Sequence, residues 1–328
     1  MCYASCVTKK LISIVLPCFN EEANVGPLYE RVKAVFEGLP QYDYECVFAD
    51  NASTDGTPEV LRSLAASDSR VKVIFNMRNF GHIRSPYNAF LLAKGDAVIV
   101  MVTDLQDPPE LIADFIREWE SGYKVVLGQK TESRESWVIF LLRSIYYKLV
   151  RAFADVELLE HVTGFGLYDR DVVERLRALE DPYPYVRGLI AELGYPVARI
   201  PYAQGKRHSG VTKNNFYTLY DMAMLGFTSH SKVPLRLAAM LGFASAVLSL
   251  LAGLAYLVYK LLFWNQISVG IAPLVIGLFF FASVQLVFLG IVGEYVGAIH
   301  TQVMHRPLVV ERERLNFDDS APGGAPRE

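Results

Sequence analysis

Two oxygen-bearing side chains, Asp104 and Gln106, follow an apolar run that extends from Val98 to Val102. Short runs rich in Val and Ile are typical of buried parallel strands, and ligands bind in open α/β sheets beyond the carboxyl ends of such strands. A carboxylate and an amide at this spacing suit Mg²⁺ or Mn²⁺ that carries a diphosphate. From these residues alone, an acid in a plain turn explains Asp104 equally well.

The residues that come next, Asp107 to Glu110, have the pattern of a helix start. Asp is a good N-cap, Pro suits the first turn, and Glu at the third position completes a capping box. We therefore predict that Asp107 caps a helix. Contact with a metal is the alternative explanation of this acid.

Apolar runs and helical segments alternate along the first part of the chain. Strands are predicted at 11–17, 44–49, 71–75, 97–102, 123–128 and 197–201, with helices between the first four of them. A short amphipathic helix is predicted at 171–179. This alternation predicts an α/β domain with a mostly parallel sheet flanked by helices.

A polar cluster follows each of the first four predicted strands. The clusters are Phe19, Asn20 and Glu21; Asp50 and Ser53; Arg78 and Gly81; and Asp104 and Gln106. Because the carboxyl ends of parallel strands meet at one edge, these side chains converge where a nucleotide would lie. A carboxylate such as Asp50 accepts a hydrogen bond from the imide N–H of a base. An Asx-rich turn alone would explain residues 50–55, but several clusters at one edge favour the nucleotide site. Asn20 is also a candidate helix cap.

The apolar residues are concentrated toward the C-terminal end of the chain. The 328-residue sequence has a mean hydropathy of +0.23, and segments 237–259 and 261–293 contain no charged residue. Each is long enough to cross about 30 Å of hydrocarbon. We expect a globular domain at 1–230, transmembrane helices at 235–260 and 271–298, and a tail at 299–328 with a possible edge strand at 306–311.

The charge distribution limits partners and location. A net charge of −3 gives no global signature of nucleic-acid binding, and the four cysteines show neither metal nor disulfide spacing. Basic residues flank the two apolar segments, and no signal peptide precedes Leu11. The positive-inside rule therefore predicts a multi-pass protein of the plasma (inner) membrane whose globular domain and tail are cytosolic. The flanking residues are Lys232, Arg236, His305, Arg306, Arg312 and Arg314.

Three further segments combine positive charge with a possible membrane or phosphate contact. Residues 137–153 predict a helix without acids whose basic side chains share one side. We interpret it as a helix that lies at the membrane surface; the alternative is a buried helix with one solvated basic stripe. Residues 205–213 contain four potential cations and two glycines, which suits phosphate clamping or a solvated basic loop. Residues 215–231 predict a juxtamembrane helix.

Five motifs together resemble the family 2 glycosyltransferases of GT-A fold, and within them the polyisoprenyl-phosphate glycosyltransferases. The motifs lie at 16–22, 50–57, 78–82, 104–110 and 207–213, within a resemblance that covers 11–312. It implies inverting transfer of a sugar from a nucleotide-sugar donor, UDP-linked, to a polyprenyl phosphate such as undecaprenyl phosphate at the cytosolic membrane face. It also implies contact with membrane lipid and a homo-oligomer such as a tetramer.

The resemblance also implies roles for individual residues. Asp104 and Gln106 would hold Mg²⁺ or Mn²⁺ and the diphosphate, and Asp104 and Arg207 would be the catalytic residues. The residues that would hold the donor are Pro17, Phe19, Glu21, Asp50, Ser53, Arg78, Gly81, Gln106 and Lys213. Those expected at the acceptor phosphate are Lys130, Arg134 and Arg143.

The chain departs from the family pattern at two motifs. Val102 stands where the family has the first Asp of its metal motif, and Gly164 and Gly166 stand where it has an acid, proposed as catalytic base, and an Arg. A phosphate monoester has a second pKa of about 6, so the acceptor is largely ionised and needs little deprotonation. Our hypothesis is an active variant. The alternatives are transfer to a lipid-linked glycan or other hydroxyl acceptor, which would need a base, and a nucleotide-sugar-binding scaffold without activity.

Overall fold

The computed structural model describes residues 9–131, 162–205, 233–263, 271–304 and 306–317. These residues fall into two compact units, an α/β unit and a unit of two long helices. The predicted helices at 137–153 and 215–231 lie outside the described residues. So do four of the predicted site residues, Arg134, Arg143, Arg207 and Lys213.

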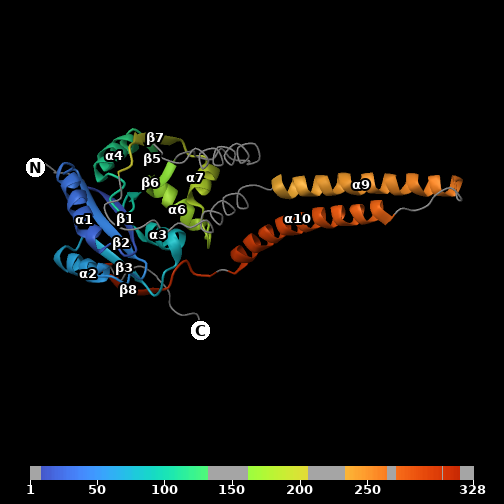
Figure 1. Cartoon of the computed structure of the whole chain (residues 1–328). Coiled ribbons are helices and arrows are strands. Elements are labelled where there is room, and N and C mark those ends of the chain that lie inside the picture. Colours follow the sequence, from blue (N-terminus) through green and yellow to red (C-terminus); the bar gives the residue numbers. More distant parts are fainter. Residues whose placement is uncertain (1–8, 132–161, 206–232, 264–270, 305, 318–328) are drawn as a thin grey trace, which may run out of the picture. The chain divides into compact units, whose positions relative to one another are not determined.

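The α/β unit contains an eight-stranded sheet with the order β7-β5-β6-β4-β1-β2-β3-β8 (Figure 1). Only β6 and β8 are antiparallel to their neighbours among the described strands, so the prediction of a mostly parallel sheet is confirmed. The strands are β1 Lys10–Cys18, β2 Tyr42–Asp50, β3 Val71–Asn76, β4 Ala97–Val100, β5 Val125–Lys130, β6 Val162–Asp169, β7 Val197–Tyr202 and β8 Glu311–Leu315.

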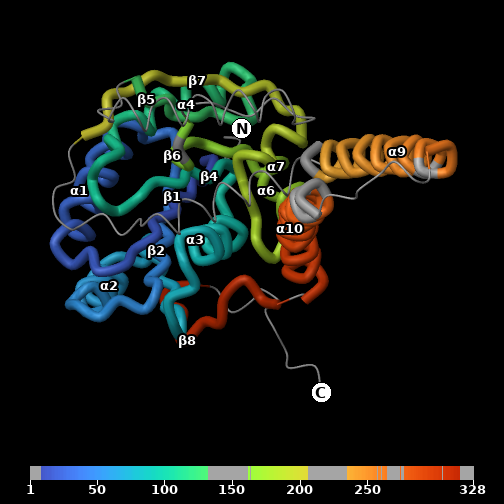
Figure 2. The backbone as a smooth tube through the Cα atoms, turned by 45° about the vertical axis from the view of Figure 1, so that its right-hand side comes forward, coloured from blue at the N-terminus to red at the C-terminus, as the bar shows by residue number. Residues whose placement is uncertain are grey.

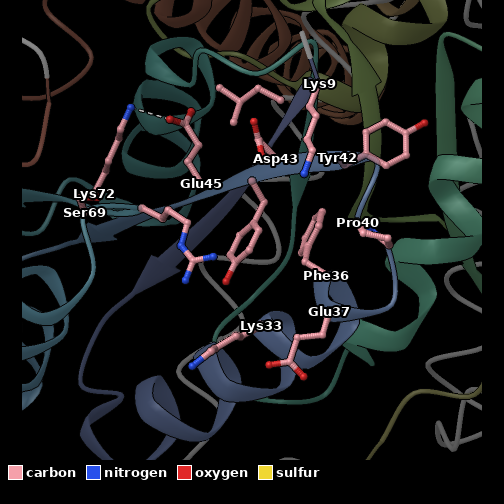
Figure 3. Close-up of a pocket in the computed structure, with 13 residues that line it drawn as sticks. Lys9, Lys33, Phe36, Glu37, Pro40, Tyr42, Asp43, Glu45, Ser69 and Lys72 are labelled. Atoms are coloured by element: carbon pink, nitrogen blue, oxygen red, sulfur yellow. Dashed lines mark ion pairs between the residues drawn. The ribbon is translucent and has the colours of Figure 1, made fainter. Parts of the chain in front are cut away.

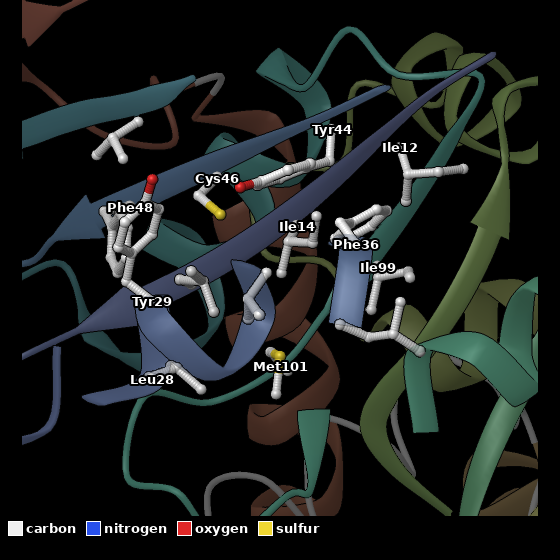
Figure 4. Close-up of a cluster of buried hydrophobic side chains, with 14 of the residues drawn as sticks. Ile12, Ile14, Leu28, Tyr29, Phe36, Tyr44, Cys46, Phe48, Ile99 and Met101 are labelled. Atoms are coloured by element: carbon white, nitrogen blue, oxygen red, sulfur yellow. The ribbon is translucent and has the colours of Figure 1, made fainter. Parts of the chain in front are cut away.

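Helices cover both faces of the sheet (Figure 2). One face packs against α1 Glu22–Glu37, α2 Thr57–Ser67 and α4 Ile112–Glu120, and the other against α3 Gly81–Leu92, α6 Arg170–Ala178 and α7 Val186–Leu193. Alternate residues of one strand point to opposite faces, so Ile14 and Val15 belong to different cores. Figure 4 shows the core beneath α1, where Ile14 lies with Phe36 and Met101. Burial on both faces explains why the parallel strands are nearly continuous apolar runs.

Two boundaries in the central part of the chain differ from the predictions. Strand β4 ends at Val100 rather than at residue 102, and the Val102 side chain is 40% exposed. The Thr103 hydroxyl donates to the carbonyl oxygen of Pro17 at 2.8 Å, so the segment after β4 stays next to β1. The prediction that Asp107 caps a helix is wrong: a 3₁₀ turn at Pro109–Leu111 precedes α4, and neither has a side-chain cap.

Two strands have sequences that ordinary strand patterns do not favour. Strand β6 contains two glycines, which are depleted in strands, and it was not predicted. The edge strand expected at 306–311 lies instead at Glu311–Leu315, where four of five residues are charged. A charged sequence suits the last strand of a sheet, because charge discourages pairing with another chain.

The second unit consists of α9, Val233–Leu262, and α10, Ile271–Val303. The segments Leu235–Tyr256 and Gly277–Val303 within them are long and apolar enough to cross a membrane. Large apolar side chains on both helices are exposed, as for Phe243 at 74%. The chain therefore carries two candidate membrane spans close to the predicted positions.

Candidate active site

The carboxyl ends of the parallel strands meet at one edge of the sheet, as the sequence predicts for its polar clusters. Cys18, the last residue of β1, is the register partner of Asp50, and Asp50 is in turn the partner of Phe75 on β3. Lys130 and Tyr202 end the neighbouring strands β5 and β7 and are paired in register. Among the predicted donor and metal residues that the structure describes, Pro17 and Asp50 lie at the ends of β1 and β2, and Gly81 begins α3. The others follow the strand ends: Phe19, Glu21, Ser53, Arg78, Asp104 and Gln106.

The loops after β1 and β2 are joined by hydrogen bonds. The backbone N–H of Asn20 donates to the Ser53 hydroxyl at 2.9 Å, and the Asn20 side-chain oxygen accepts from the backbone N–H of Thr54 at 2.8 Å. Asn20 has φ +59 and is not the cap of α1, so that prediction is wrong. The backbone N–H of Glu21 donates to the Thr57 hydroxyl at 2.9 Å. Glu21 and Ser53 are therefore fixed in one substructure.

Asp50 is a buried carboxyl group at the end of β2. Its residue is 0% exposed, and both of its oxygens accept from the backbone N–H of Ser53 at 3.3 Å. Burial raises the pKa of Asp50 above its ordinary value, while the bonds from Ser53 and the charge of Arg312 act in the opposite direction. The bonds from Ser53 therefore hold the carboxyl group in place at the end of β2.

The amide of Asn51, which the sequence argument missed, organises the loop that contains Arg78 and Gly81. Its nitrogen donates to the Asn79 side-chain oxygen at 2.9 Å, and its oxygen accepts from the backbone N–H of Phe80 at 2.9 Å. Arg78 is exposed, and its guanidinium lies over the Phe80 ring, 4.1 Å from the centroid. The available signal was that single Asn residues recur at these strand ends, Asn51 after β2 and Asn76 and Asn79 at and after the end of β3.

Asp104 belongs to a tight turn that follows β4. Its carboxylate accepts from the backbone N–H of Gln106 at 3.1 Å, and Leu105 between them has φ +60. A non-glycine residue in this left-handed region is uncommon and marks a backbone that its surroundings hold in place. Asp104 is 5% exposed. The turn explanation and the ligand explanation are compatible, because the turn fixes where the carboxylate lies.

A buried pair, Asp107 and Tyr202, holds this turn against β7. The Tyr202 hydroxyl donates to an Asp107 oxygen at 2.6 Å. Tyr202 is 5% exposed and Asp107 is 3% exposed. Burial raises the pKa of Asp107, and the Tyr202 bond and the charge of Lys130 oppose that rise. The backbone N–H of Gly205 donates to the Gln106 carbonyl oxygen at 3.0 Å. The residues around Asp107 have the local pattern of a helix cap, whereas its hydrogen-bond partner, Tyr202, is distant in the sequence.

The protein groups that could hold a divalent metal at this edge are few. Among the described ranges, no three residues of His, Cys, Asp or Glu are grouped so that they could bind a metal ion. Asp104 and Gln106 lie on one turn, and each carries a side-chain oxygen. This small set of hard oxygen donors fits Mg²⁺ or Mn²⁺ whose other ligands come from a diphosphate and water.

A pocket of ≈ 710 Å³ lies at the opposite, amino edge of the sheet (Figure 3). It is lined by the first residues of β1 and β2, the end of α1 and the start of β3, among them Lys33, Glu37 and Tyr42. Positive and negative side chains alternate around it, and Lys72 pairs with Glu45 at 2.5 Å. This pocket is separate from the edge that carries Asp50.

Comparison with known proteins identifies the family. The model of the family described as "Glycosyl transferase family 2" matches residues 13–177. This chain belongs to glycosyl transferase family 2. A putative glycosyltransferase of Bacillus subtilis (strain 168) is 36% identical over 306 residues, covering 92% of each chain. The bactoprenol glucosyl transferase of Shigella phage SfV is 32% identical over 305 residues, covering 92% of this chain and 99% of that protein.

A solved structure matched in the comparison is glucosyl-3-phosphoglycerate synthase from Mycobacterium tuberculosis in complex with Mn²⁺, uridine diphosphate and phosphoglyceric acid. It is 20% identical, with a TM-score of 0.47, and covers 67% of this chain and 76% of that one. The family match, together with the α/β sheet and its two helical layers, confirms the predicted fold class.

The two glycines that depart from the family pattern have different structural settings in this family 2 glycosyltransferase. Gly164 is exposed, and a Cβ added to it would meet nothing within 4 Å. A Cβ added to Gly166 would lie 2.5 Å from the carbonyl oxygen of Val126 on β5. Pairing of β5 with β6 therefore requires glycine at 166, whereas position 164 has room for a side chain.

Proposed function

We propose that this family 2 glycosyltransferase moves a sugar from a UDP-linked donor to a polyprenyl phosphate at the cytosolic face of a membrane, with inversion at the anomeric carbon. The observation that carries the proposal is the meeting of Asp50, Asp104 and Lys130 at one sheet edge. Such a transfer requires a carboxylate that binds the nucleotide base, an acid that binds the metal and a cation that binds a phosphate. The similarity to bactoprenol glucosyl transferase extends over 92% of the chain.

The donor would lie across the carboxyl ends of β1 to β4. Asp50 would accept from the imide N–H of the base, with Pro17, Phe19, Glu21 and Ser53 beside the base and ribose and with Arg78 and Gly81 on the next loop. Asp104 and Gln106 would hold Mg²⁺ or Mn²⁺ with the diphosphate. When bound, such a metal stabilises the negative charge that collects on the departing diphosphate.

The acceptor phosphate would be held by positive side chains. Lys130 ends β5 beside Tyr202, and Arg134, Arg143, Arg207 and Lys213 are the further candidates by sequence. One phosphate oxygen would attack the anomeric carbon as the bond to the nucleoside diphosphate breaks, so an α-linked donor gives a β-linked lipid product. The acceptor is largely a dianion at neutral pH, since its second pKa is about 6. The reaction therefore has no need of the acid that Gly164 replaces.

The two apolar helices would anchor the enzyme beside its lipid substrate. Basic residues flank both segments, which favours a multi-pass arrangement in the plasma (inner) membrane with the α/β unit in the cytosol. Lys and Arg near the membrane surface would also attract the anionic acceptor. Assembly as a homo-oligomer is part of this proposal.

Turnover of the full-length protein in detergent tests the proposal. Undecaprenyl phosphate is combined with UDP- and GDP-sugars and Mg²⁺ or Mn²⁺, nucleoside diphosphate release is followed, and the lipid is analysed by mass spectrometry. We expect a phosphodiester-linked glycolipid from a UDP-sugar, and Asp104→Ala should abolish metal-dependent donor binding while the protein stays folded. Donor binding without any glycolipid would overturn the assignment of the acceptor, and turnover with GDP-sugars alone would overturn that of the donor.

A further inference from the structure

The strand that follows the second apolar helix in the chain, β8, is the last strand of the sheet and lies next to β3. It pairs antiparallel with β3, and Figure 1 shows it beyond β3 at the end of the sheet. Glu313 forms an ion pair with Arg62 of α2 at 2.7 Å, and Glu311 accepts from the Asn88 amide of α3 at 2.9 Å. The helices on both faces of the sheet therefore hold this strand in place.

An irregularity in the pairing of β8 with β3 lies at Arg312. Phe75 is paired with Glu313, but the next residue of β3, Asn76, is paired with Glu311, so Arg312 is skipped in the register. A β-bulge of this kind changes the direction of a side chain and is frequent beside active sites. The Arg312 guanidinium lies 5.6 Å from the centroid of the Phe75 ring. Phe75 is the register partner of Asp50 on β2, so the bulge is level with this carboxyl group, with β3 between the two strands.

We propose that Arg312 is a positioning residue of the donor site, which holds the carboxylate of Asp50 ready for the base of the nucleotide. The inference rests on the proposed UDP-linked donor. It makes nucleotide affinity depend on a strand that lies beyond both apolar helices in the sequence. Nucleotide binding and correct placement of the C-terminal segment are thereby linked.

The electrostatic surroundings of Asp50 support this role. Burial disfavours the charged form of a carboxyl group, and a nearby cation restores it. Arg312 lowers the pKa of Asp50, while the carboxylate of Asp55, which accepts from Thr57, raises it. The thiol of Cys18 beside it is kept neutral, because burial raises its pKa. An ionised Asp50 accepts a hydrogen bond from the imide N–H of the base. A protonated Asp50 would instead present its own O–H donor to that N–H donor.

Binding of UDP to the full-length protein in detergent, measured by isothermal titration calorimetry with Mg²⁺ present, tests the inference. Arg312→Ala should raise the dissociation constant about tenfold, the size of effect expected when a nearby cation is removed from a buried carboxylate. Arg312→Lys should restore most of the affinity. The matched control is Arg314→Ala, because Arg314 is on the same strand and pairs with Glu311. We expect this control to bind UDP as the wild type does.

A double-mutant cycle separates a role through Asp50 from a general effect on folding. If Arg312 acts through Asp50, Arg312→Ala should have little further effect on UDP binding in an Asp50→Asn background. Equal losses in both backgrounds, wild-type affinity in Arg312→Ala, or a wild-type protein that binds no UDP would each overturn the inference. A protein that binds UDP in this manner but produces no polyprenyl-linked product would leave the inference standing and refute the proposed acceptor.

Discussion

Replacement of Tyr202 by Phe tests whether the buried pair with Asp107 holds the proposed metal turn in place. The change removes one hydroxyl group, which donates to Asp107 at 2.6 Å, and leaves the ring packed against Phe165. A hydrogen bond to a charged group contributes about 1.5–3 kcal/mol to stability. In a domain of about 150–250 residues, each kcal/mol shifts the Tm by roughly 2–4 °C. We therefore expect Tyr202→Phe to lower the Tm by about 3–12 °C.

The same substitution should reduce catalysis more than its loss of stability explains. The pair joins β7 to the Asp104 turn, and the bond from Gly205 to Gln106 joins the segment after β7 to the same turn. A displacement of about 1 Å in a catalytic group costs on the order of 100-fold in rate. We expect kcat/KM for the nucleotide sugar to fall about 10- to 100-fold at a temperature where the variant is fully folded.

Tyr87→Phe provides a matched control for this experiment. The Tyr87 hydroxyl is also buried and donates to the carbonyl oxygen of Leu176 at 3.0 Å, between α3 and α6. Its loss should cost about 0.5–1.5 kcal/mol of stability, with kcat/KM unchanged. If Tyr202→Phe is destabilised as expected but retains the wild-type kcat/KM, the pair has no part in positioning the metal turn, and the argument is refuted.

Three further predictions concern charge and space at the site. Burial raises the pKa of Asp50, so the folded state loses stability as the pH rises through that raised value. Asp50→Asn does not titrate, so this variant should be more stable than the wild type near pH 7 by about 0.5–2 kcal/mol. The difference in stability should close toward pH 4 in thermal melts, and equal pH dependence of the two proteins would contradict this. Val102→Asp, at an exposed position, should lower the Mn²⁺ concentration for half-maximal activity several-fold relative to Val102→Asn, and identical activation curves would count against the metal turn. Gly166→Ala should destabilise the protein by about 1–3 kcal/mol and Gly164→Ala by almost nothing, as measured by thermal unfolding, because only the first added Cβ meets a backbone oxygen. Similar melting temperatures for these two variants would show that β5 moves to accommodate the extra atom.

The elements of the sheet could be predicted because their signals are local. Strands β1, β2 and β3 are buried on both faces, so each is an apolar run bounded by polar residues. Parallel connection through helices then requires that their carboxyl ends meet at one edge. That requirement depends on topology alone, so residues as distant in sequence as Asp50 and Lys130 could be expected at one edge.

The contacts that fix the site could not be predicted in the same way, because they join distant segments. Asp107 has the local pattern of a cap, yet its hydroxyl partner, Tyr202, is 95 residues away in the sequence. Strand β8 is charged rather than apolar because it lies at an edge, and its register against β3 depends on a bulge. Local propensity contains no information about either partner, so a single sequence leaves these contacts undetermined.

The departures from the family pattern change the charge of the site in one direction. Val102 and Gly164 each stand where a carboxylate is usual, so the site has two fewer negative charges than that pattern supplies. A nucleotide sugar and a lipid phosphate are both anions, and each carboxylate between them would add repulsion in a poorly hydrated site. Loss of the base is tolerable for an acceptor that is already ionised, whereas a hydroxyl acceptor would still require one. The absence of an acid at Gly164 weakens the case for hydroxyl transfer, whereas both departures are compatible with transfer to phosphate. Gly164→Asp, with Gly164→Asn as its neutral counterpart, should accordingly raise the KM for polyprenyl phosphate without raising kcat, and a gain in kcat would show that a base had been missing.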